Sequence, residues 1–228
     1  MKIRNLHSWD VDYKTAVAIQ ADLRGKLVLR DDEPGDIRIV AGADISCNKG
    51  DDRVYAAVVL LDAATLDVVE EASHSGRISF PYIPGLLSFR EGPSLLRAFD
   101  KLRRRPDVVL FDGQGIAHPR GFGLAAHMGL ILDLPSVGCA KTRLIGTFEE
   151  PGARRGNRSP LVHDGKRIGT VLRTKDRVKP VFVSQGHRIS LERAEDVILQ
   201  CTRRYRIPEP IRRAHILVNK MRKEGNRG

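Results

Sequence analysis

The chain has 228 residues, of which 41% are hydrophobic, and it carries a net charge of +11. A hydrophobic share of this size supports a buried core and excludes a globally disordered chain. Most of the positive charge lies in two stretches: residues 141–188 contain 12 Lys and Arg against 4 Asp and Glu, and residues 201–228 contain 9 against 2. Because contacts between basic side chains and phosphates release bound counterions, this distribution favours a nucleic acid partner. A charged surface that serves only solubility would have the same composition.

The three cysteines, Cys47, Cys139 and Cys201, form neither a close pair nor a metal-ligand spacing. Scattered thiols are typical of a reducing compartment without disulfide bonds. No stretch reaches the roughly 18 apolar residues of a membrane span, and the first residues lack the apolar run of a signal peptide. We therefore expect a cytoplasmic protein with no membrane partner. We also expect a single domain over residues 1–228 and a monomer.

Hydrophobic spacing predicts a helix and three strands in the first third of the chain. Ala16, Ile19, Leu23 and Leu27 recur at helical spacing within residues 12–27. Strand-like runs follow at Ile37–Cys47, Val54–Asp62 and Leu66–Ser79. The gap between the second and third runs is short enough for a hairpin, so the sheet should begin as an antiparallel meander.

Helical and strand patterns alternate in the middle of the chain. Apolar residues recur at helical spacing over residues 86–102, interrupted by Gly92-Pro93, which predicts two short helices or one broken helix. The next predicted elements are a buried strand, a helix and a second buried strand, over Val108–Asp112, Gly123–Leu134 and Ser136–Lys141. A helix between two such strands favours parallel pairing with a right-handed crossover.

The last third is expected to start with a surface loop, because residues 149–165 are rich in Gly, Pro and Arg. Two strands that pair like a hairpin and two closing helices follow, over Arg167–Arg173, Val181–Ser184, 190–204 and 209–223. Three meander strands followed by alternating helices and strands indicate an α/β protein with a ribonuclease H-like domain. Its mixed central sheet would combine an antiparallel meander with parallel strands, flanked by helices.

Two aspartates interrupt apolar strands. Asp44 lies within Ile39–Ile45, and Asp112 ends the run Val108–Asp112. Burying a lone carboxylate costs several kcal/mol, so such a residue needs a partner such as a cation. Two carboxylates on adjacent strands can share one hard metal ion. The alternatives are an ion-paired strand residue for Asp44 and a turn residue for Asp112. Glu91, taken alone, has the pattern of an ordinary exposed helix residue.

Several long motifs resemble the signature of the endonuclease V family, the deoxyinosine 3′ endonucleases. They occur in the family's order over nearly the whole chain and include no departure at a motif position. The matching segments are Gly42–Ser46, Phe80–Pro93, Phe111–Arg120, Gly138–Thr142, Arg177–Val181, Ser184–Ser190 and His215 within Ile211–His215.

The resemblance implies a ribonuclease H-like fold and a divalent metal, Mg²⁺ with Mn²⁺ as a substitute. It implies recognition of hypoxanthine in DNA and cleavage of the second phosphodiester bond on its 3′ side, leaving a 3′-hydroxyl. It also implies that Asp44 and Asp112 bind the metal, that Glu91 completes the acidic set and that His215 assists nearby.

Two basic residues are expected to take part in the chemistry. Neutral His215 would orient the nucleophile, and protonated His215 would steady the leaving oxygen. Lys141 would neutralise phosphate charge in the transition state. The alternatives, an exposed helix histidine and a solvated lysine at a strand end, stay open.

The segment Pro81-Tyr82-Ile83-Pro84 combines two backbone-restricting prolines with a large aromatic side chain. Such a loop can act as a stiff wedge in the gap left by an extruded base. Composition alone favours a loop with Tyr82 packed inward, and the resemblance makes Tyr82 the wedge. His118 and Arg120 are expected to contact phosphate, close to a pocket for the extruded base formed by Gly85, Leu87, Gly113, Gly115, Gly123 and Gly138.

Two other functions compete with this interpretation. One is a ribonuclease H-like nuclease that acts on inosine-containing RNA or on branched or mismatched DNA, which would share the carboxylates but would not need the wedge. The other is a basic, non-catalytic RNA-binding module, which leaves Asp44 and Asp112 unexplained. DNA containing deoxyinosine is the expected partner, with inosine-containing RNA as the alternative.

Overall fold

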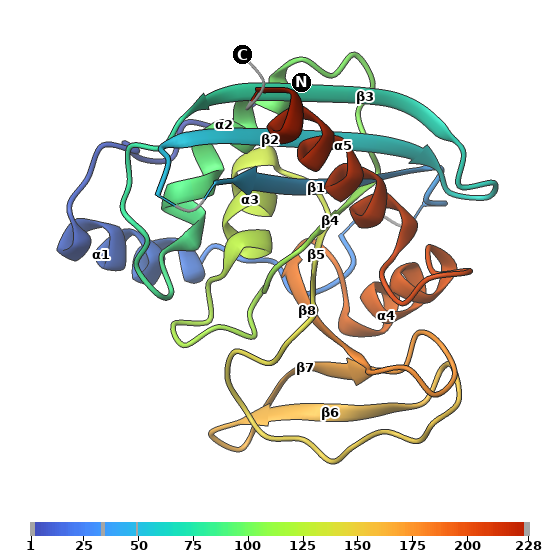
Figure 1. Cartoon of the computed structure of the whole chain (residues 1–228). Helices are drawn as coiled ribbons and strands as arrows, with labels where there is room; N and C mark the ends of the chain where they lie inside the picture. The colour runs from blue at the N-terminus through green and yellow to red at the C-terminus, as the bar shows by residue number, and fades with distance from the viewer. Residues whose placement is uncertain (1–2, 33–34, 49, 226–228) are drawn as a thin grey trace.

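The computed structural model describes residues 3–32, 35–48 and 50–225 (Figure 1). Its strands form one mixed sheet in the order β3-β2-β1-β4-β5-β8-β7-β6. The strands are β1 (Ile39–Cys47), β2 (Arg53–Asp62), β3 (Val68–Arg77), β4 (Val108–Phe111), β5 (Ser136–Ala140), β6 (Arg158–His163), β7 (Lys166–Leu172) and β8 (Val181–His187). The helices are α1 (Tyr13–Arg24), α2 (Leu87–Asp100), α3 (Leu124–Leu132), α4 (Leu191–Gln200) and α5 (Glu209–Gly225).

The predicted meander is confirmed: β1 pairs with β2 and β2 with β3, both antiparallel. The turn between β2 and β3 is closed by Asp62, whose Oδ1 accepts hydrogen bonds from the backbone N–H groups of Ala64 and Thr65, each at 2.9 Å. Leu66 has a φ of 62° in this turn, so β3 begins at Val68 rather than at Leu66. A carboxylate that bonds its own following backbone is a common way to stabilise such a turn.

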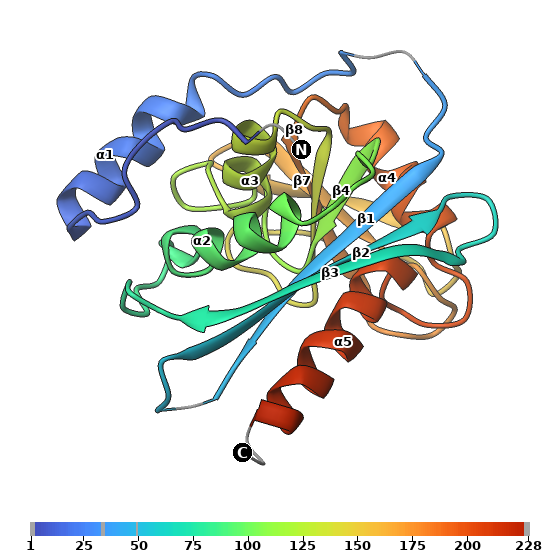
Figure 2. The same ribbon diagram turned by 90° about the horizontal axis from the view of Figure 1, so that it is seen from above.

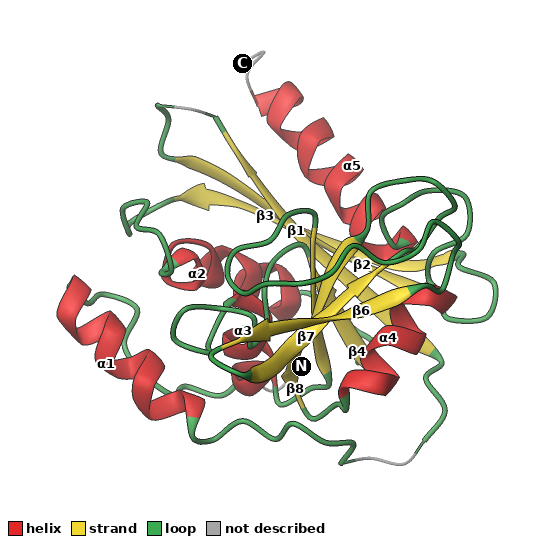
Figure 3. Cartoon of the chain, turned by 90° about the horizontal axis from the view of Figure 1, so that it is seen from below, coloured by secondary structure: helices red, strands yellow, loops and turns green. Residues whose placement is uncertain are grey.

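The sheet separates two layers of helices (Figures 2 and 3). Side chains of α2 and α3 pack in one hydrophobic core, and those of α4 and α5 pack in another. The predicted parallel pairing is confirmed for β1 with β4 and for β4 with β5, whereas β8 runs antiparallel to β5. All described strands belong to one sheet, which supports the single domain over residues 1–228; that extent stays a prediction.

Helix α2 is continuous through Gly92-Pro93, so the expectation of two short helices or one broken helix is wrong. Proline inside a helix costs about 3 kcal/mol, because it removes one hydrogen bond and crowds the preceding turn. Phe89 and Phe99 are fully buried on either side of it, and each large apolar side chain stabilises by about 1.5–3 kcal/mol when buried. Gly92 lies against Trp9, where an added Cβ would come within 2.6 Å of the indole ring.

The predicted loop over residues 149–165 contains the edge strand β6, so that part of the prediction is wrong. Pro160 is unfavourable for a strand inside a sheet. An edge strand tolerates a proline because the missing N–H can lie on the side that faces no neighbouring strand. Asp164 and Gly165 both have positive φ, 49° and 71°, and join β6 to β7 in a tight hairpin. The expected antiparallel pairing of β7 with β8 is confirmed.

Among the described residues, no helix combines the length and the apolar character needed to cross a membrane.

Three buried histidines make the fold sensitive to acid. Burial lowers the pKa of His118 and of His187 to about 4, and it lowers the pKa of His127 well below the usual value. Unfolding restores a pKa near 6.5, so the unfolded chain binds more protons between about pH 4 and pH 6.5. Stability is therefore lost as the pH falls through this window.

We expect His118 and His187 each to reduce the free energy of unfolding by roughly 2 kcal/mol between pH 7 and pH 5. The backbone N–H of Val28 donates to His187 Nδ1 at 3.2 Å, and the amide oxygen of His187→Asn can replace this acceptor. Urea unfolding at pH 7 and pH 5 should therefore show a smaller acid loss in His187→Asn than in the wild type. Equal losses in the two proteins would show that His187 does not contribute.

Candidate active site

Asp44 and Asp112 lie side by side because β1 and β4 run parallel. Ala43 is paired with Phe111 in this ladder, so the next residue of each strand falls at the same level. Adjacent strands are about 4.8 Å apart, which brings the two carboxylates close together. The side chain of Asp44 is 12% exposed and that of Asp112 is 16% exposed. Two nearly buried carboxylates therefore lie close together where β4 ends beside β1.

Glu91, on α2, is the third acid near these two aspartates. Burial and then the negative charges of Asp44 and Asp112 raise the pKa of the Glu91 carboxyl to about 8. The pKa of Asp44 is also raised, by burial and next by the charge of Asp112. The negative charges of the neighbouring acids thus disfavour ionisation of Glu91 and of Asp44, and a bound cation would remove that penalty. The structure thus places Glu91 within electrostatic reach of both aspartates, and its role as a metal ligand stays a prediction.

The donor set suits a hard divalent cation, because it consists of carboxylate oxygens. Among the described residues, no group of three or more His, Cys, Asp or Glu side chains is arranged so that it could hold a metal ion. A cation held here would need water or phosphate oxygens as further ligands, which is the usual situation for Mg²⁺. The residues therefore fit magnesium better than a fully protein-enclosed metal such as structural zinc.

His215 contacts Asp44 because α5 lies directly against β1. A Cβ on Gly42 would come within 2.0 Å of the Pro210 carbonyl carbon, so only glycine allows this approach. The next turns of α5 then bring His215 over the strand, and His215 Nδ1 lies 2.7 Å from Asp44 Oδ2. The His215 side chain is 52% exposed. The structure thus joins His215 to the acidic set, as expected.

Lys141 follows β5 and forms an ion pair with Asp112 through its Nζ. This contact places the Lys141 ammonium at the rim of the acidic site, and the side chain is still partly exposed. The position suits contact with an incoming phosphate, so the sequence-based role of Lys141 is geometrically possible.

The loop Pro81–Pro84 presents its tyrosine to solvent. Tyr82 is 69% exposed, so the alternative in which Tyr82 packs inward is wrong. The loop is held at both ends: Arg90 donates to the Phe80 carbonyl oxygen at 3.0 Å, and Arg120 donates to the Gly85 carbonyl oxygen at 2.6 Å. Gly85 has a φ of 80°, which allows the sharp turn into α2. The loop that carries the exposed Tyr82 is therefore fixed by hydrogen bonds at both ends.

A cavity of about 140 Å³ opens beside this loop. An apolar protein cavity of about 150 Å³ holds benzene, so this cavity has room for one six-membered ring. The larger, two-ring system of a purine would extend into the open side of the cavity. Leu87 lines it, and Glu91 follows one turn later on the same face of α2. Its lining residues are Gln20, Tyr82, Ile83, Pro84, Gly85, Leu87, Ser88, Gln114, His118, Gly123, Leu124 and Leu144.

Only some of the residues expected to form a base pocket line this cavity. Gly85, Leu87 and Gly123 do, but Gly113, Gly115 and Gly138 are not among the lining residues. A Cβ on Gly115 would come within 1.9 Å of the Gln185 carbonyl oxygen, and one on Gly138 within 2.3 Å of the Gly115 backbone nitrogen. Gly115 and Gly138 therefore allow backbone segments to pack closely, which is a structural role.

His118 and Arg120 lie beneath the Pro81–Pro84 loop. The Arg120 guanidinium binds both the Gly85 carbonyl oxygen and the Gln20 side-chain oxygen, and His118 is almost fully buried. These contacts give the pair a bracing role, and phosphate contact stays a prediction. Sequence reasoning missed Gln20, whose amide also donates to Gly85 at 3.0 Å and to the Phe122 carbonyl at 3.1 Å. The signal for Gln20 was a polar residue on the apolar face of α1.

Two basic grooves border the site. One, of about 440 Å³, contains His118 of the cavity wall together with Arg24, Lys166 and Arg167. The other, of about 420 Å³, runs along α5 past His215.

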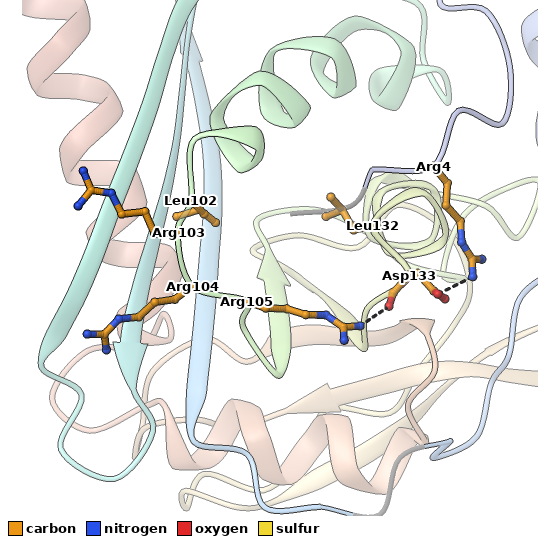
Figure 4. Close-up of a pocket in the computed structure, with 7 residues that line it drawn as sticks. All are labelled: Arg4, Leu102, Arg103, Arg104, Arg105, Leu132 and Asp133. Carbon is orange, nitrogen blue, oxygen red and sulfur yellow. Dashed lines mark hydrogen bonds and ion pairs between the residues drawn. The ribbon is translucent and has the colours of Figure 1, made fainter.

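An arginine-lined cavity of about 320 Å³ lies elsewhere. Figure 4 shows Arg4 and Arg105 directed at Asp133 within it. Arg105 precedes β4 and Asp112 follows it, so this cavity lies at the opposite end of the strand from the carboxylates. It is therefore separate from the acidic site.

The chain is similar to known proteins over nearly its whole length. The family model described as Endonuclease V matches residues 21–216. An Endonuclease V of Rhodospirillum centenum is 51% identical over 220 residues, which cover 95% of this chain and 91% of that protein. The crystal structure of the Endonuclease V from Streptomyces avermitilis superposes with a TM-score of 0.91 and 46% identity, covering 99% of this chain and 100% of that one.

A more distant structure carries a nucleic acid. Endonuclease V of Ciona intestinalis, solved with a 24mer DNA containing an inosine followed by a ribo-adenosine, is 28% identical, with a TM-score of 0.83. The alignment covers 93% of this chain and 99% of that one. The likeness to Endonuclease V structures and the mixed sheet confirm the predicted ribonuclease H-like fold. Since the family model and relatives above 45% identity span most of its length, this chain belongs to the Endonuclease V family and is an endonuclease.

Proposed function

We propose that this endonuclease recognises hypoxanthine in DNA and hydrolyses the second phosphodiester bond on its 3′ side in a Mg²⁺-dependent reaction. The observation that carries the proposal is a ring-sized cavity beneath an exposed, braced Tyr82, one helical turn from Glu91. The Ciona relative, whose fold this chain shares, was solved with inosine-containing DNA.

The spacing of cavity and carboxylates is compatible with a cut close to the extruded base. One turn of α2 advances about 5.4 Å, and Leu87 at the cavity precedes Glu91 at the acidic set by one turn. Two nucleotides of a DNA strand advance about 7 Å along the helix axis. A base held in the cavity would therefore bring a phosphate one or two nucleotides away to the carboxylates.

In this proposal Tyr82 fills the gap that an extruded base leaves in the stack, which stabilises the open duplex. Gly85 and Gly123 bring backbone groups to the cavity wall. Hypoxanthine carries an oxygen acceptor at position 6 and a hydrogen on N1, whereas adenine carries an amino donor and a bare N1. Fixed backbone donors and acceptors can distinguish hypoxanthine from adenine, because the wrong base leaves a buried polar group without a hydrogen-bond partner.

Asp44, Asp112 and Glu91 would hold Mg²⁺, which when bound polarises the scissile phosphate and lowers the pKa of water. Asp44 and Asp112 would face the phosphate from adjacent strands. Lys141 leaves its ion pair with Asp112 to neutralise charge on the phosphate in the transition state. The basic grooves beside His118 and along α5 hold the flanking backbone.

The proposal is tested by single-turnover cleavage of oligonucleotides of one sequence that carry inosine in DNA, inosine in RNA, uracil in DNA or no lesion. We expect rapid nicking of inosine in DNA and at least tenfold slower cutting of the uracil and undamaged strands. Faster cutting of inosine in RNA would assign the enzyme to RNA instead. Equal cutting of all four strands would contradict a base-reading pocket.

A further inference from the structure

Both ring nitrogens of His215 are engaged in hydrogen bonds. Nδ1 lies 2.7 Å from Asp44 Oδ2, and Nε2 lies 3.0 Å from the side-chain Nδ2 of Asn219, one turn later on α5. A neutral imidazole carries one hydrogen, which makes one nitrogen a donor and the other an acceptor. The nitrogen that carries the hydrogen decides how His215 can act on Asp44.

The orientation of the Asn219 amide answers this question. Its Oδ1 lies 3.2 Å from the Arg222 guanidinium and 3.2 Å from the Ser46 hydroxyl, which donates to it. A guanidinium can only donate, so the atom facing Arg222 must be the amide oxygen. On the other side, Asn219 Nδ2 donates to the His215 backbone carbonyl oxygen at 2.9 Å. Arg222 and the His215 carbonyl oxygen therefore demand the same orientation of the amide, and the Ser46 hydroxyl is compatible with it.

The second N–H of Asn219 then points at His215 Nε2. Because an N–H donor cannot face another N–H, Nε2 must accept this hydrogen bond and carry no hydrogen. The single hydrogen of the ring consequently lies on Nδ1, from which it is donated to Asp44 Oδ2. Neither ring nitrogen keeps a lone pair free to take a proton from water.

We propose that Asn219 and Arg222 are positioning residues that hold the His215 ring with its Nδ1–H on Asp44, so that His215 orients the Asp44 carboxylate. The role of Asp44 in holding a cation rests on the function proposed above. Oδ2 of Asp44 accepts the imidazole hydrogen, which fixes the orientation of the carboxylate. A histidine hydrogen-bonded to a metal-binding carboxylate is a common outer contact that fixes ligand geometry. Arg222 is itself anchored, because its guanidinium donates to Asn48 Oδ1 at 3.0 Å.

The tautomer is measured by ¹⁵N NMR of the histidine side chains in the full-length protein, with the His215 signals assigned by their loss in His215→Gln. In the wild type we expect Nε2 at the shift of an unprotonated, accepting nitrogen and Nδ1 at that of a protonated one. Asn219→Asp puts an acceptor in place of the amide donor, so the Nε2 shift should move away from its wild-type value. Ile216→Val, at the exposed neighbouring position, is the control and should leave both shifts unchanged.

A protonated Nε2 in the wild type, or an unchanged Nε2 shift in Asn219→Asp, would overturn the proposal. These readings need no cleavage, so they remain decisive even where the proposed substrate is not cut. With inosine DNA as substrate, Asn219→Asp should lower kcat by about 10- to 100-fold, as loss of an outer contact to a metal ligand does. KM should stay within about twofold. A raised KM at unchanged kcat would mean that Asn219 contacts DNA and would contradict the positioning role.

Discussion

Replacement of Asp44 by alanine is expected to lower the nicking rate on inosine DNA by roughly 1000-fold or more, because a catalytic metal supplies several kcal/mol of transition-state stabilisation and each 1.4 kcal/mol is tenfold in rate. DNA binding should persist, because phosphate contacts by basic side chains supply most of its free energy. Single-turnover cleavage gives the rate, and fluorescence anisotropy in the absence of cleavage gives the affinity.

Asp44→Asn separates the loss of charge from the loss of packing, because it keeps the shape of the side chain. It should be as inactive as Asp44→Ala. Asp100→Ala removes an exposed carboxylate at the far end of α2 and should leave the rate unchanged. Magnesium-dependent nicking by Asp44→Ala at the wild-type rate would rule out Asp44 as part of the metal site.

Replacement of Tyr82 by alanine is expected to reduce selectivity for inosine over undamaged DNA by roughly 5- to 150-fold, since stacking of an aromatic ring on a base contributes about 1–3 kcal/mol. The ring is exposed and its loop is braced at Phe80 and Gly85, so its removal should leave the fold intact. The ratio of kcat/KM for the two duplexes measures the effect.

Tyr82→Phe keeps the ring and should preserve most of the selectivity. Tyr13→Ala removes another exposed tyrosine, on α1, and is the matched control. If Tyr82→Ala left the selectivity ratio at its wild-type value, the wedge would have to be a different residue.

The acidic site was only partly predictable from the residues alone. Asp44 and Asp112 could be identified because each interrupts an apolar strand, where an unpaired carboxylate is costly. Glu91 and His215 have the local pattern of ordinary helix residues, and only the family motifs singled them out. Their roles depend on how α2 and α5 lie against β1, and the approach of Pro210 to Gly42 is a tertiary contact that hydrophobic spacing does not encode.

The same limit explains the misjudged parts of the fold. Gly92-Pro93 is a strong local signal for a helix break, but burial of Phe89 and Phe99 holds α2 together across it. Pro160 argued against a strand, although Asp164-Gly165 is a strong hairpin signal and the sheet edge tolerates the proline. In both places tertiary packing outweighs local preference.

The supporting contacts were the least visible in the sequence. Gln20 interrupts the apolar face of α1 and so had a detectable signal, but its partners Gly85 and Arg120 are far away in the chain. Asn219 lies one helical turn after His215, a spacing at which side chains meet. The orientation of its amide depends on Arg222 and Ser46, which only the three-dimensional structure brings together.

The central claim is that a metal-dependent acidic site cuts DNA at a fixed distance from a base held in the cavity. The most direct measurement is to map the break in an end-labelled duplex with one inosine, incubated with Mg²⁺ or with EDTA. We predict a single nick at the second phosphodiester bond on the 3′ side, with a 3′-hydroxyl that a polymerase extends, and no nick in EDTA. A nick that forms in EDTA, or one on the 5′ side of the inosine, would contradict the claim.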